Sequence, residues 1–274
     1  MKKLFYILLC SVIAISFYSC ELFQIDNYAA PKETIKGAII DVATGDTVYT
    51  DEGSEGIRVR LRELSWTETP TPDNFDFLCM NNGTYQNTKV FKGHYNVQFD
   101  GPFVPLIRLK QNGDTIADDS KYLDIKGVTV LDVKVQPFLK VVWAGTPTLS
   151  NGQITAKFIV TRAVSAADFK AKVEPMGGWN DNFLDVTDVT LFVSESPSVG
   201  YRDSRPGTSP YSTIVNYSGN AFNSLFGTTI TVTSSSKIPA GRTVFVRAGA
   251  RMRYATAGIS RNNYNVAVRV DTPK

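Results

Sequence analysis

The sequence predicts an all-β protein made of two β-sandwiches in tandem. Apolar and polar residues alternate with a period of two along most of the chain, which is typical of strands with one buried face. The clearest case is Ile57, Val59 and Leu61, which alternate with three arginines. Asn-Gly pairs and similar turn residues separate the alternating runs and favour tight hairpins. Only one stretch predicts a helix.

The remaining elements follow along the chain. Alternation recurs at residues 95–99, 154–160, 189–193, 230–232, 244–250 and 266–270. The apolar face changes within residues 128–135, which predicts a bulge near Thr129. Ser165 to Asp168 have the form of a capping box, so a helix of two or three turns should begin there and end before Pro175. A boundary near Gln136-Pro137 separates residues 32–136 from residues 137–274, and each length suits one sandwich.

The first residues predict export and lipid anchoring. Lys2 and Lys3 precede a 15-residue apolar run that ends at Ser19-Cys20. This is the layout of a secretory signal, and the run is shorter than the roughly 20 residues that a transmembrane helix needs. Residues 17–20 resemble a bacterial lipobox. We therefore expect a signal peptide over residues 1–19, acylation of Cys20 and a tether over residues 20–31, with two or more acyl chains giving stable anchoring.

Composition limits the classes of function. The chain has three cysteines. If Cys10 leaves with the signal and Cys20 is acylated, only Cys79 remains, and no intramolecular disulfide can form. The formal net charge is +3, and removal of Lys2 and Lys3 leaves +1. Such a balance lacks the electrostatic signature of nucleic-acid binding, so no nucleic-acid partner is expected.

Few residues suggest catalysis. His94 is the single histidine, which argues against a Ser-His-Asp triad and a two-histidine zinc site. Cys79 has apolar neighbours and is expected to be buried and inert. Asp181, Asp185 and Asp188 lie close in sequence, but their spacing is not that of an EF-hand. We expect no catalytic residue, metal or cofactor, and hence no enzyme. The alternative is a glycoside hydrolase, which needs only two carboxylates.

Loop aromatics are the candidates for ligand binding. Tyrosine and tryptophan combine an apolar ring with a polar group, which suits the faces and hydroxyls of sugars. Trp66 enters a proline-rich insertion, and Trp179, Asn180 and Asp181 share a turn-rich loop. A long connection adds three further candidates, Tyr201, Arg202 and Tyr211. The alternative for each tryptophan is packing, which we expect for Trp143 near the domain junction.

Several motifs carry a family resemblance. Residues 33–41, 44–46 and 56–59, with Asn82-Gly83-Thr84-Tyr85, resemble carboxypeptidase-regulatory-like (transthyretin-like) domains. Residues 242–247 resemble a strand of a fibronectin-III-like or immunoglobulin-like sandwich. The whole chain resembles a family of two-domain Bacteroidetes outer-membrane lipoproteins of unknown function, which are generally encoded beside Sus-like glycan-uptake transporters.

The resemblance implies a location and partners. It implies a protein anchored in the outer membrane at the cell surface, with a Sus-like transporter complex and polysaccharide as partners. The implied function is glycan or nutrient binding for polysaccharide utilization. The alternative is a structural spacer or assembly partner of the transporter with no small ligand. Thr47 and Thr115 lie in Asp-Thr-aliphatic triplets that resemble the O-glycosylation sequon of exported Bacteroidetes proteins, although each triplet is also an ordinary turn before a strand.

Overall fold

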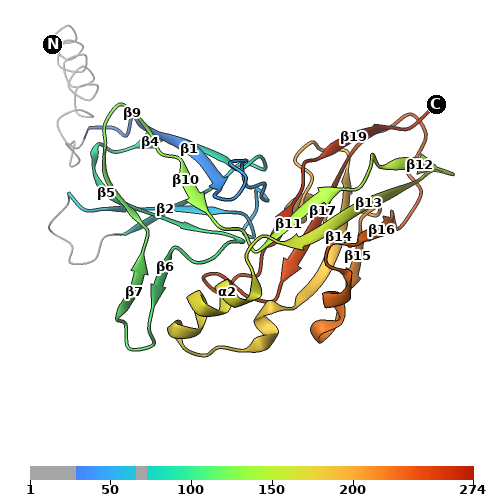
Figure 1. The fold of residues 1–274 in the computed structure, drawn as a ribbon. Helices are drawn as coiled ribbons and strands as arrows, with labels where there is room; N and C mark the ends of the chain where they lie inside the picture. Colours follow the sequence, from blue (N-terminus) through green and yellow to red (C-terminus); the bar gives the residue numbers. More distant parts are fainter. Residues whose placement is uncertain (1–28, 66–72) are drawn as a thin grey trace, which may run out of the picture.

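The computed structural model describes residues 29–65 and 73–274 and shows two β-sandwiches side by side (Figure 1). The all-β prediction is confirmed. The first half contains β1 (Glu33–Asp41), β2 (Arg58–Glu63), β3 (Asn74–Leu78), β4 (Thr84–Val90), β5 (Gly93–Asp100), β6 (Ile107–Leu109), β7 (Thr115–Asp118), β8 (Lys121–Ile125), β9 (Val128–Val130) and β10 (Val133–Val135). In the residues described, no helix combines the length and the apolar character needed to cross a bilayer.

The first sandwich encloses its core between two sheets. One has the strand order β10-β1-β4, with β9 also paired to β1, and the other has the order β3-β2-β5-β8. The alternating apolar residues of β1, β2 and β5 face inward, and Ile39, Leu61 and Val97 are fully buried. The two-stranded β6–β7 hairpin projects from this sandwich (Figure 1).

Strand pairing with β1 is interrupted between β9 and β10, close to Thr129, where a bulge was predicted. Both short strands run parallel to β1, at either end of it. Between them the Leu131 carbonyl oxygen accepts a hydrogen bond from the Tyr85 hydroxyl at 2.6 Å. A Cβ on Gly37 would lie 1.9 Å from that oxygen. This interruption of the pairing therefore lies against a glycine of β1. The predicted bulge near Thr129 is wrong, because β9 and β10 keep one register along β1, with Val128 opposite Thr34 and Val133 opposite Ile39.

The second sandwich has the same two-layer design. It is built from β11 (Leu139–Trp143), β12 (Thr148–Ser150), β13 (Gln153–Arg162), β14 (Val186–Ser194), β15 (Thr213–Asn216), β16 (Thr229–Thr233), β17 (Thr243–Met252), β18 (Asn262–Tyr264) and β19 (Val268–Asp271). One sheet has the order β11-β13-β12 with β16 on β13, and the other has the order β15-β14-β17-β18 with β19 on β17. Phe158, Leu191 and Val246 are fully buried between the sheets.

The predicted helix is present as α2 (Ala166–Val173). The Ser165 hydroxyl caps its first turn by accepting a hydrogen bond from the Asp168 backbone N–H at 3.0 Å. Phe169 and Val173 are the buried residues of the helix, so its apolar side closes one end of the second core. The helix ends before Pro175, and a short 3₁₀ turn, η1 (Glu174–Met176), follows it.

Arg247 of β17 connects the two sandwiches. Its side chain is only 2% exposed. The guanidinium donates to the carbonyl oxygens of Thr50 at 2.8 Å and Asn81 at 3.1 Å, both in the first sandwich. Burial lowers the pKa of this arginine to about 10. The charge is accepted in the interior because backbone carbonyls surround it.

Three further side chains of the second sandwich reach the first. Each donates to a backbone carbonyl oxygen there: Arg261 to Gly56 at 3.0 Å, Asn263 to Pro102 at 3.0 Å and Thr256 to Gly101 at 2.7 Å. Because the acceptors are backbone atoms, these contacts fix one sandwich against the main chain of the other. The two halves therefore meet in one defined arrangement.

Candidate functional site

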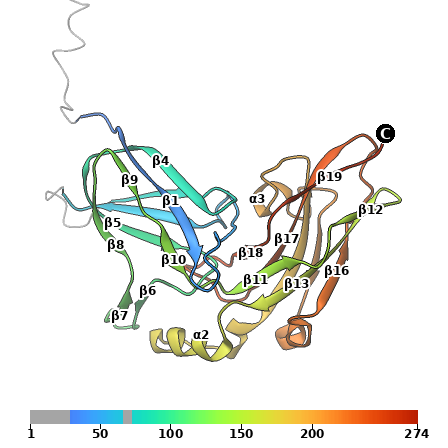
Figure 2. The same cartoon turned by 45° about the horizontal axis from the view of Figure 1, so that its top comes forward.

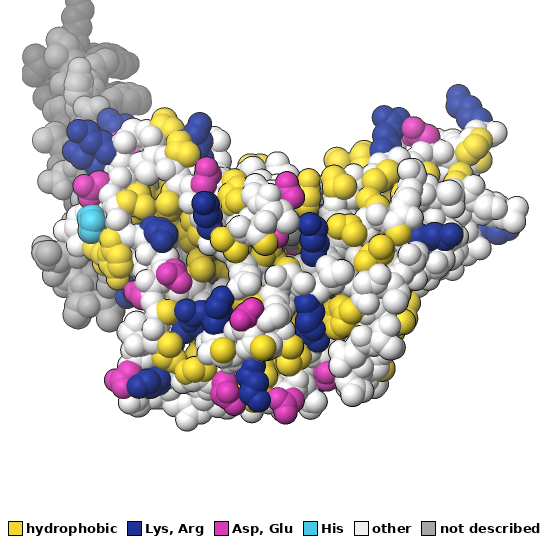
Figure 3. All heavy atoms as spheres, viewed as in Figure 1, with side chains coloured by type: hydrophobic (Ala, Val, Ile, Leu, Met, Phe, Trp, Pro, Cys, Tyr) yellow, Lys and Arg dark blue, Asp and Glu magenta, His cyan; other side chains and the backbone are white. Residues whose placement is uncertain are grey.

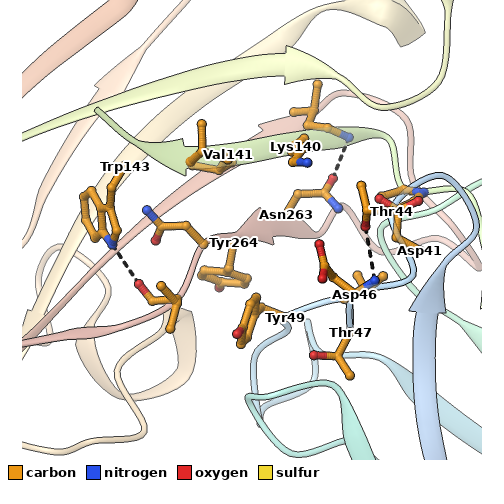
Figure 4. Close-up of a pocket in the computed structure, with 16 residues that line it drawn as sticks. Asp41, Thr44, Asp46, Thr47, Tyr49, Lys140, Val141, Trp143, Asn263 and Tyr264 are labelled. Carbon is orange, nitrogen blue, oxygen red and sulfur yellow. Dashed lines mark hydrogen bonds between the residues drawn. The ribbon is translucent and has the colours of Figure 1, made fainter. Parts of the chain in front are cut away.

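A cleft of about 450 Å³ lies between the two sandwiches. The end of β1 and the loop after it form one side of the cleft, and β11 with residues 263–266 forms the other (Figure 4). Ligand pockets commonly have volumes of about 300–1,000 Å³, so the cleft is large enough for a small ligand. Its chemically distinctive residues are Asp46, Tyr49, Lys140, Trp143, Tyr264 and Asn265.

Aromatic rings line the cleft in fixed orientations. Tyr49 and Tyr264, one from each sandwich, lie side by side (Figure 4). The guanidinium carbon of Arg247 is 4.2 Å from the centroid of the Tyr264 ring and 5.8 Å from that of Tyr49. The Trp143 indole N–H donates to the Val266 carbonyl at 2.9 Å, and its ring packs edge-on against Phe158. The rings are therefore positioned before any ligand arrives.

Asn265 contributes an unusual donor to the cleft. The side chain is 4% exposed, and its Oδ1 accepts a hydrogen bond from the Ala248 backbone N–H at 2.9 Å. Its Nδ2 is buried and has no hydrogen-bond partner among the described residues. In Asn263, by contrast, both side-chain atoms are used, with Leu139 and Pro102. A buried donor without an acceptor is costly, so the Asn265 amide is a donor with unmet hydrogen-bonding capacity in the wall of the cleft.

Charged groups of both signs stand on opposite sides of the cleft. Asp46 of the first sandwich and Lys140 of the second are exposed, and neither forms an ion pair within the part of the chain that the structure describes. Asp41 is buried, and its Oδ1 accepts from the Ala43 backbone N–H at 2.9 Å. Rings, amides and charged groups together offer both apolar and hydrogen-bonding contacts to a polar ligand.

The predicted Trp179 loop lies elsewhere and satisfies its own groups. The indole N–H donates to Asp181 Oδ1 at 2.8 Å, and the ring packs against Phe169 and Phe183. The Trp179 hydrogen bond, with nearby Lys170, lowers the pKa of Asp181. Asn180 caps the 3₁₀ turn η2 (Asp181–Leu184). These three residues therefore hold the loop together through contacts within it and with neighbouring rings.

The other predicted residues do not join that loop. Tyr201 and Arg202 lie in the short α3 (Tyr201–Ser204) beside the first sandwich, well apart from α2 (Figure 2). The Arg202 side chain is bidentate to Asp203, and its backbone N–H donates to Asp51 Oδ1. Tyr211 packs against the second core. Trp66 and the predicted lipidation site Cys20 lie outside the described residues.

The two predicted glycosylation sites differ in access. Thr47 is half-buried, pairs with Ile40 through an isolated β-bridge and lines the cleft. Thr115 is exposed at the start of β7 on the projecting hairpin. Of the two residues, Thr115 is the more exposed.

The remaining chemical candidates are separated from one another. Cys79 is buried as predicted, and burial raises the pKa of its thiol to about 12. His94 Nδ1 is 2.7 Å from Asp124 Oδ1 on the exposed surface. Asp188 is buried and paired with Arg251 at 2.9 Å, whereas Asp181 is exposed. Residues 29–65 and 73–274 contain no group of three histidine, cysteine or acidic side chains that could hold a metal ion.

The sequence carried a signal for the cleft that the period-two pattern does not show. Residues 262–265 read Asn-Asn-Tyr-Asn, and asparagine is depleted in strands. An amide-rich strand suggests side chains that bond across an interface, which is the role of Asn263 here. Trp143 was expected to pack near the domain junction, and it does so at the edge of the cleft.

Comparison with known proteins identifies relatives. A family model described as "Protein of unknown function (DUF3823) N-terminal domain" matches residues 33–136. A DUF3823 family protein from Bacteroides uniformis ATCC 8492 has a similar structure, with 48% sequence identity and a TM-score of 0.84 over 89% of this chain and 100% of that chain.

More distant relatives share the fold. A second protein from Bacteroides uniformis, described as a "putative carbohydrate binding protein", is 20% identical with a TM-score of 0.61, over 88% of this chain and 99% of that chain. A DUF3823 family protein from Parabacteroides merdae is 15% identical with a TM-score of 0.58, over 89% of this chain and 100% of that chain. No curated protein matches the chain.

Proposed function

The chain belongs to the DUF3823 family, and from this premise we propose that it is a non-catalytic carbohydrate-binding protein whose site is the cleft between its sandwiches. The observation that carries the proposal is the buried Asn265 amide, which lines the cleft and lacks an acceptor among the described residues. A sugar hydroxyl or ring oxygen is an acceptor of the right kind. The description of the second Bacteroides uniformis protein supports the same ligand class.

The surrounding groups suit a sugar. Tyr49, Tyr264 and Trp143 provide apolar ring surface, and Asp46 and Lys140 provide an acceptor and a donor at the rim. The rings are held by Arg247 and by the Val266 carbonyl, so binding would order few side chains. Preorganisation of this kind favours affinity because little conformational entropy is lost.

We place this binding protein at the outer membrane. Acylation of Cys20 would anchor it, and the signal-like segment before that cysteine supports export. A Sus-like uptake complex is the proposed partner, with the cleft holding polysaccharide for it at the cell surface. The hydrogen-bonded contact between the sandwiches also suits the second candidate function, a rigid spacer in that complex.

Titration calorimetry with a panel of polysaccharides tests the proposal. Trp143→Phe and Trp179→Phe form a matched pair, because each removes one indole N–H donor in the second sandwich. Binding in the cleft should be weakened several-fold by Trp143→Phe and left unchanged by Trp179→Phe. The opposite result would place the site at the Trp179 loop.

Asn265→Asp tests directly whether the unpartnered amide nitrogen of Asn265 contributes to binding. It keeps Oδ1 as an acceptor for the Ala248 N–H and removes the unpartnered donor. Loss of one hydrogen bond to a sugar corresponds to about 1 kcal/mol, or roughly a fivefold weaker Kd. If no glycan binds and a stoichiometric membrane partner is recovered by crosslinking, the spacer role is favoured. Products released from a glycan on long incubation would instead establish a hydrolase.

A further inference from the structure

A concentration of lysines marks one end of the first sandwich. Five exposed lysines lie at the start of β1 and in the strands and turns around it: Lys32, Lys36, Lys89, Lys92 and Lys126. None of them forms an ion pair or a side-chain hydrogen bond within residues 29–65 and 73–274. The chain as a whole is nearly neutral, with a formal net charge of +3 in 274 residues. The positive charge at this end is therefore a local feature.

The strand register brings these lysines together. Glu33 pairs with Val90 of β4, and Thr34 pairs with Val128 of β9. The turns that carry Lys92 and Lys126 therefore flank the first residue of β1. A hollow of about 790 Å³ lies between them, lined by Ala29, Ala30 and three of the lysines. Figure 3 shows basic side chains gathered at this end of the molecule.

The acidic residues nearby are engaged. The Glu33 carboxylate is buried and accepts the Gly127 backbone N–H. Glu63 accepts the Ser65 N–H at 2.8 Å, and Asp124 lies 2.7 Å from His94. These hydrogen bonds do not remove the negative charges, but within residues 29–65 and 73–274 none of the five lysines is paired with a carboxylate, so their ammonium groups can contact an external anion.

Apolar side chains border the basic ones. Val128 is 65% exposed and Val130 is 63% exposed, on the outer face of the sheet beside Thr34 and Lys36. Phe91, next to Lys92, is 40% exposed. A basic surface with exposed apolar residues is the pattern that seats proteins on anionic lipid, because headgroups attract the charges and the apolar groups enter the interface.

We propose that this end of the first sandwich docks onto the anionic headgroups of the membrane that anchors the chain, an inference that rests on the proposed acylation of Cys20. Position supports it as well as charge. The described chain begins at Ala29 within the lysine-lined hollow. From Cys20 to Tyr28 there are nine residues, which span at most about 30 Å when extended. The lysines are thus the part of the molecule nearest the proposed anchor.

The test uses the full acylated chain in vesicles that contain nitroxide-labelled phospholipid. A single cysteine replaces Val128 and carries a fluorophore, which Cys79 does not compete for because it is buried. The vesicles are phosphatidylcholine alone or with about 30% phosphatidylglycerol. A second probe at Leu109→Cys on the β6–β7 hairpin is the control, since Leu109 is also exposed.

Docking predicts strong quenching at position 128 and little at position 109, in anionic vesicles only. Lys32→Gln, Lys92→Gln and Lys126→Gln combined should lower the docked fraction by on the order of tenfold, as should about 0.5 M salt. The charge-matched control Lys157→Gln, Lys237→Gln and Lys274→Gln on the second sandwich should leave it unchanged. Equal quenching at 128 in neutral vesicles, or no effect of the first triple variant, would overturn the docking. Failure of the chain to associate with either vesicle would overturn the anchor on which it rests.

Discussion

Replacement of Arg247 by methionine should separate the two sandwiches energetically. The side chain makes four hydrogen bonds to backbone carbonyl oxygens: Asn265 at 2.9 Å, Thr50 at 2.8 Å, Asn81 at 3.1 Å and Val199 at 3.3 Å. Two of these acceptors belong to the first sandwich and two to the second. Methionine fills part of the volume but leaves all four carbonyls without this donor.

Two opposing effects set the magnitude. Hydrogen bonds to a charged group are worth about 1.5–3 kcal/mol each, so four contribute about 6 kcal/mol at the low end. Burial opposes this, because the arginine pKa falls from 12.5 to about 10, which corresponds to about 3 kcal/mol. Methionine removes that cost together with the bonds. The expected loss in the free energy of unfolding is therefore about 3 kcal/mol.

Urea unfolding followed by tryptophan fluorescence and circular dichroism measures this loss. We expect a lower midpoint and, because the contact between the sandwiches is weakened, two resolved transitions. Arg269→Met is the matched control: Arg269 is an exposed arginine of β19 paired with Asp271, and its loss should cost less than about 1 kcal/mol. A variant at position 247 within about 0.5 kcal/mol of the original protein, the range usual for surface substitutions, and with one transition would refute the reasoning.

Three further predictions concern buried groups. Burial raises the pKa of Glu55, so the folded chain holds this proton to higher pH than the unfolded chain and loses stability as pH rises above 4.5. The stability of Glu55→Gln relative to the original protein should therefore increase between pH 4 and pH 7 in urea titrations. A constant difference would contradict this. The Cys79 thiol, with a pKa of about 12, should resist a disulfide reagent at pH 8 and react only in denaturant, as peptide mass spectrometry can show. Gly37→Ala should lower the free energy of unfolding by about 3 kcal/mol or more, since its Cβ would meet the Leu131 carbonyl. Gly127→Ala, at positive φ with open space around it, should lower it by about 1 kcal/mol. Equal midpoints for the two variants in thermal melts would argue against the close approach of Leu131 to Gly37.

Local signals in the sequence were sufficient for most of the fold. Alternation identified core strands such as β2, β13 and β17, and the Ser165 capping box placed α2 correctly, because both depend on residues a few positions apart. The bulge predicted near Thr129 was wrong, because β9 and β10 keep one register along β1. The interruption between these strands comes from the close approach of the Leu131 carbonyl to Gly37, which joins residues about 90 positions apart and leaves no local pattern.

The cleft was beyond such reasoning for a similar reason. In β17 the alternation Val244, Val246, Ala248 and Ala250 identifies the face toward the second core. The same pattern leaves Arg247 on the opposite face, where solvent is the ordinary neighbour. That face is instead covered by the first sandwich, through contacts between residues as far apart as Thr50 and Arg247. Periodicity predicts which residues of a strand face the core of their own sandwich. It does not predict which part of the chain covers the opposite face.

The donors that join the sandwiches also determine what a bound molecule would experience. Arg247, Arg261 and Asn263 all bond to main-chain atoms of the partner half. The two sandwiches therefore form one rigid unit, with the cleft between them and the lysine-rich end on the far side of the first sandwich. A ligand in the cleft would keep a constant distance and orientation relative to any surface that the lysine-rich end contacts. The fold would then fix the orientation of a bound ligand as well as bind it.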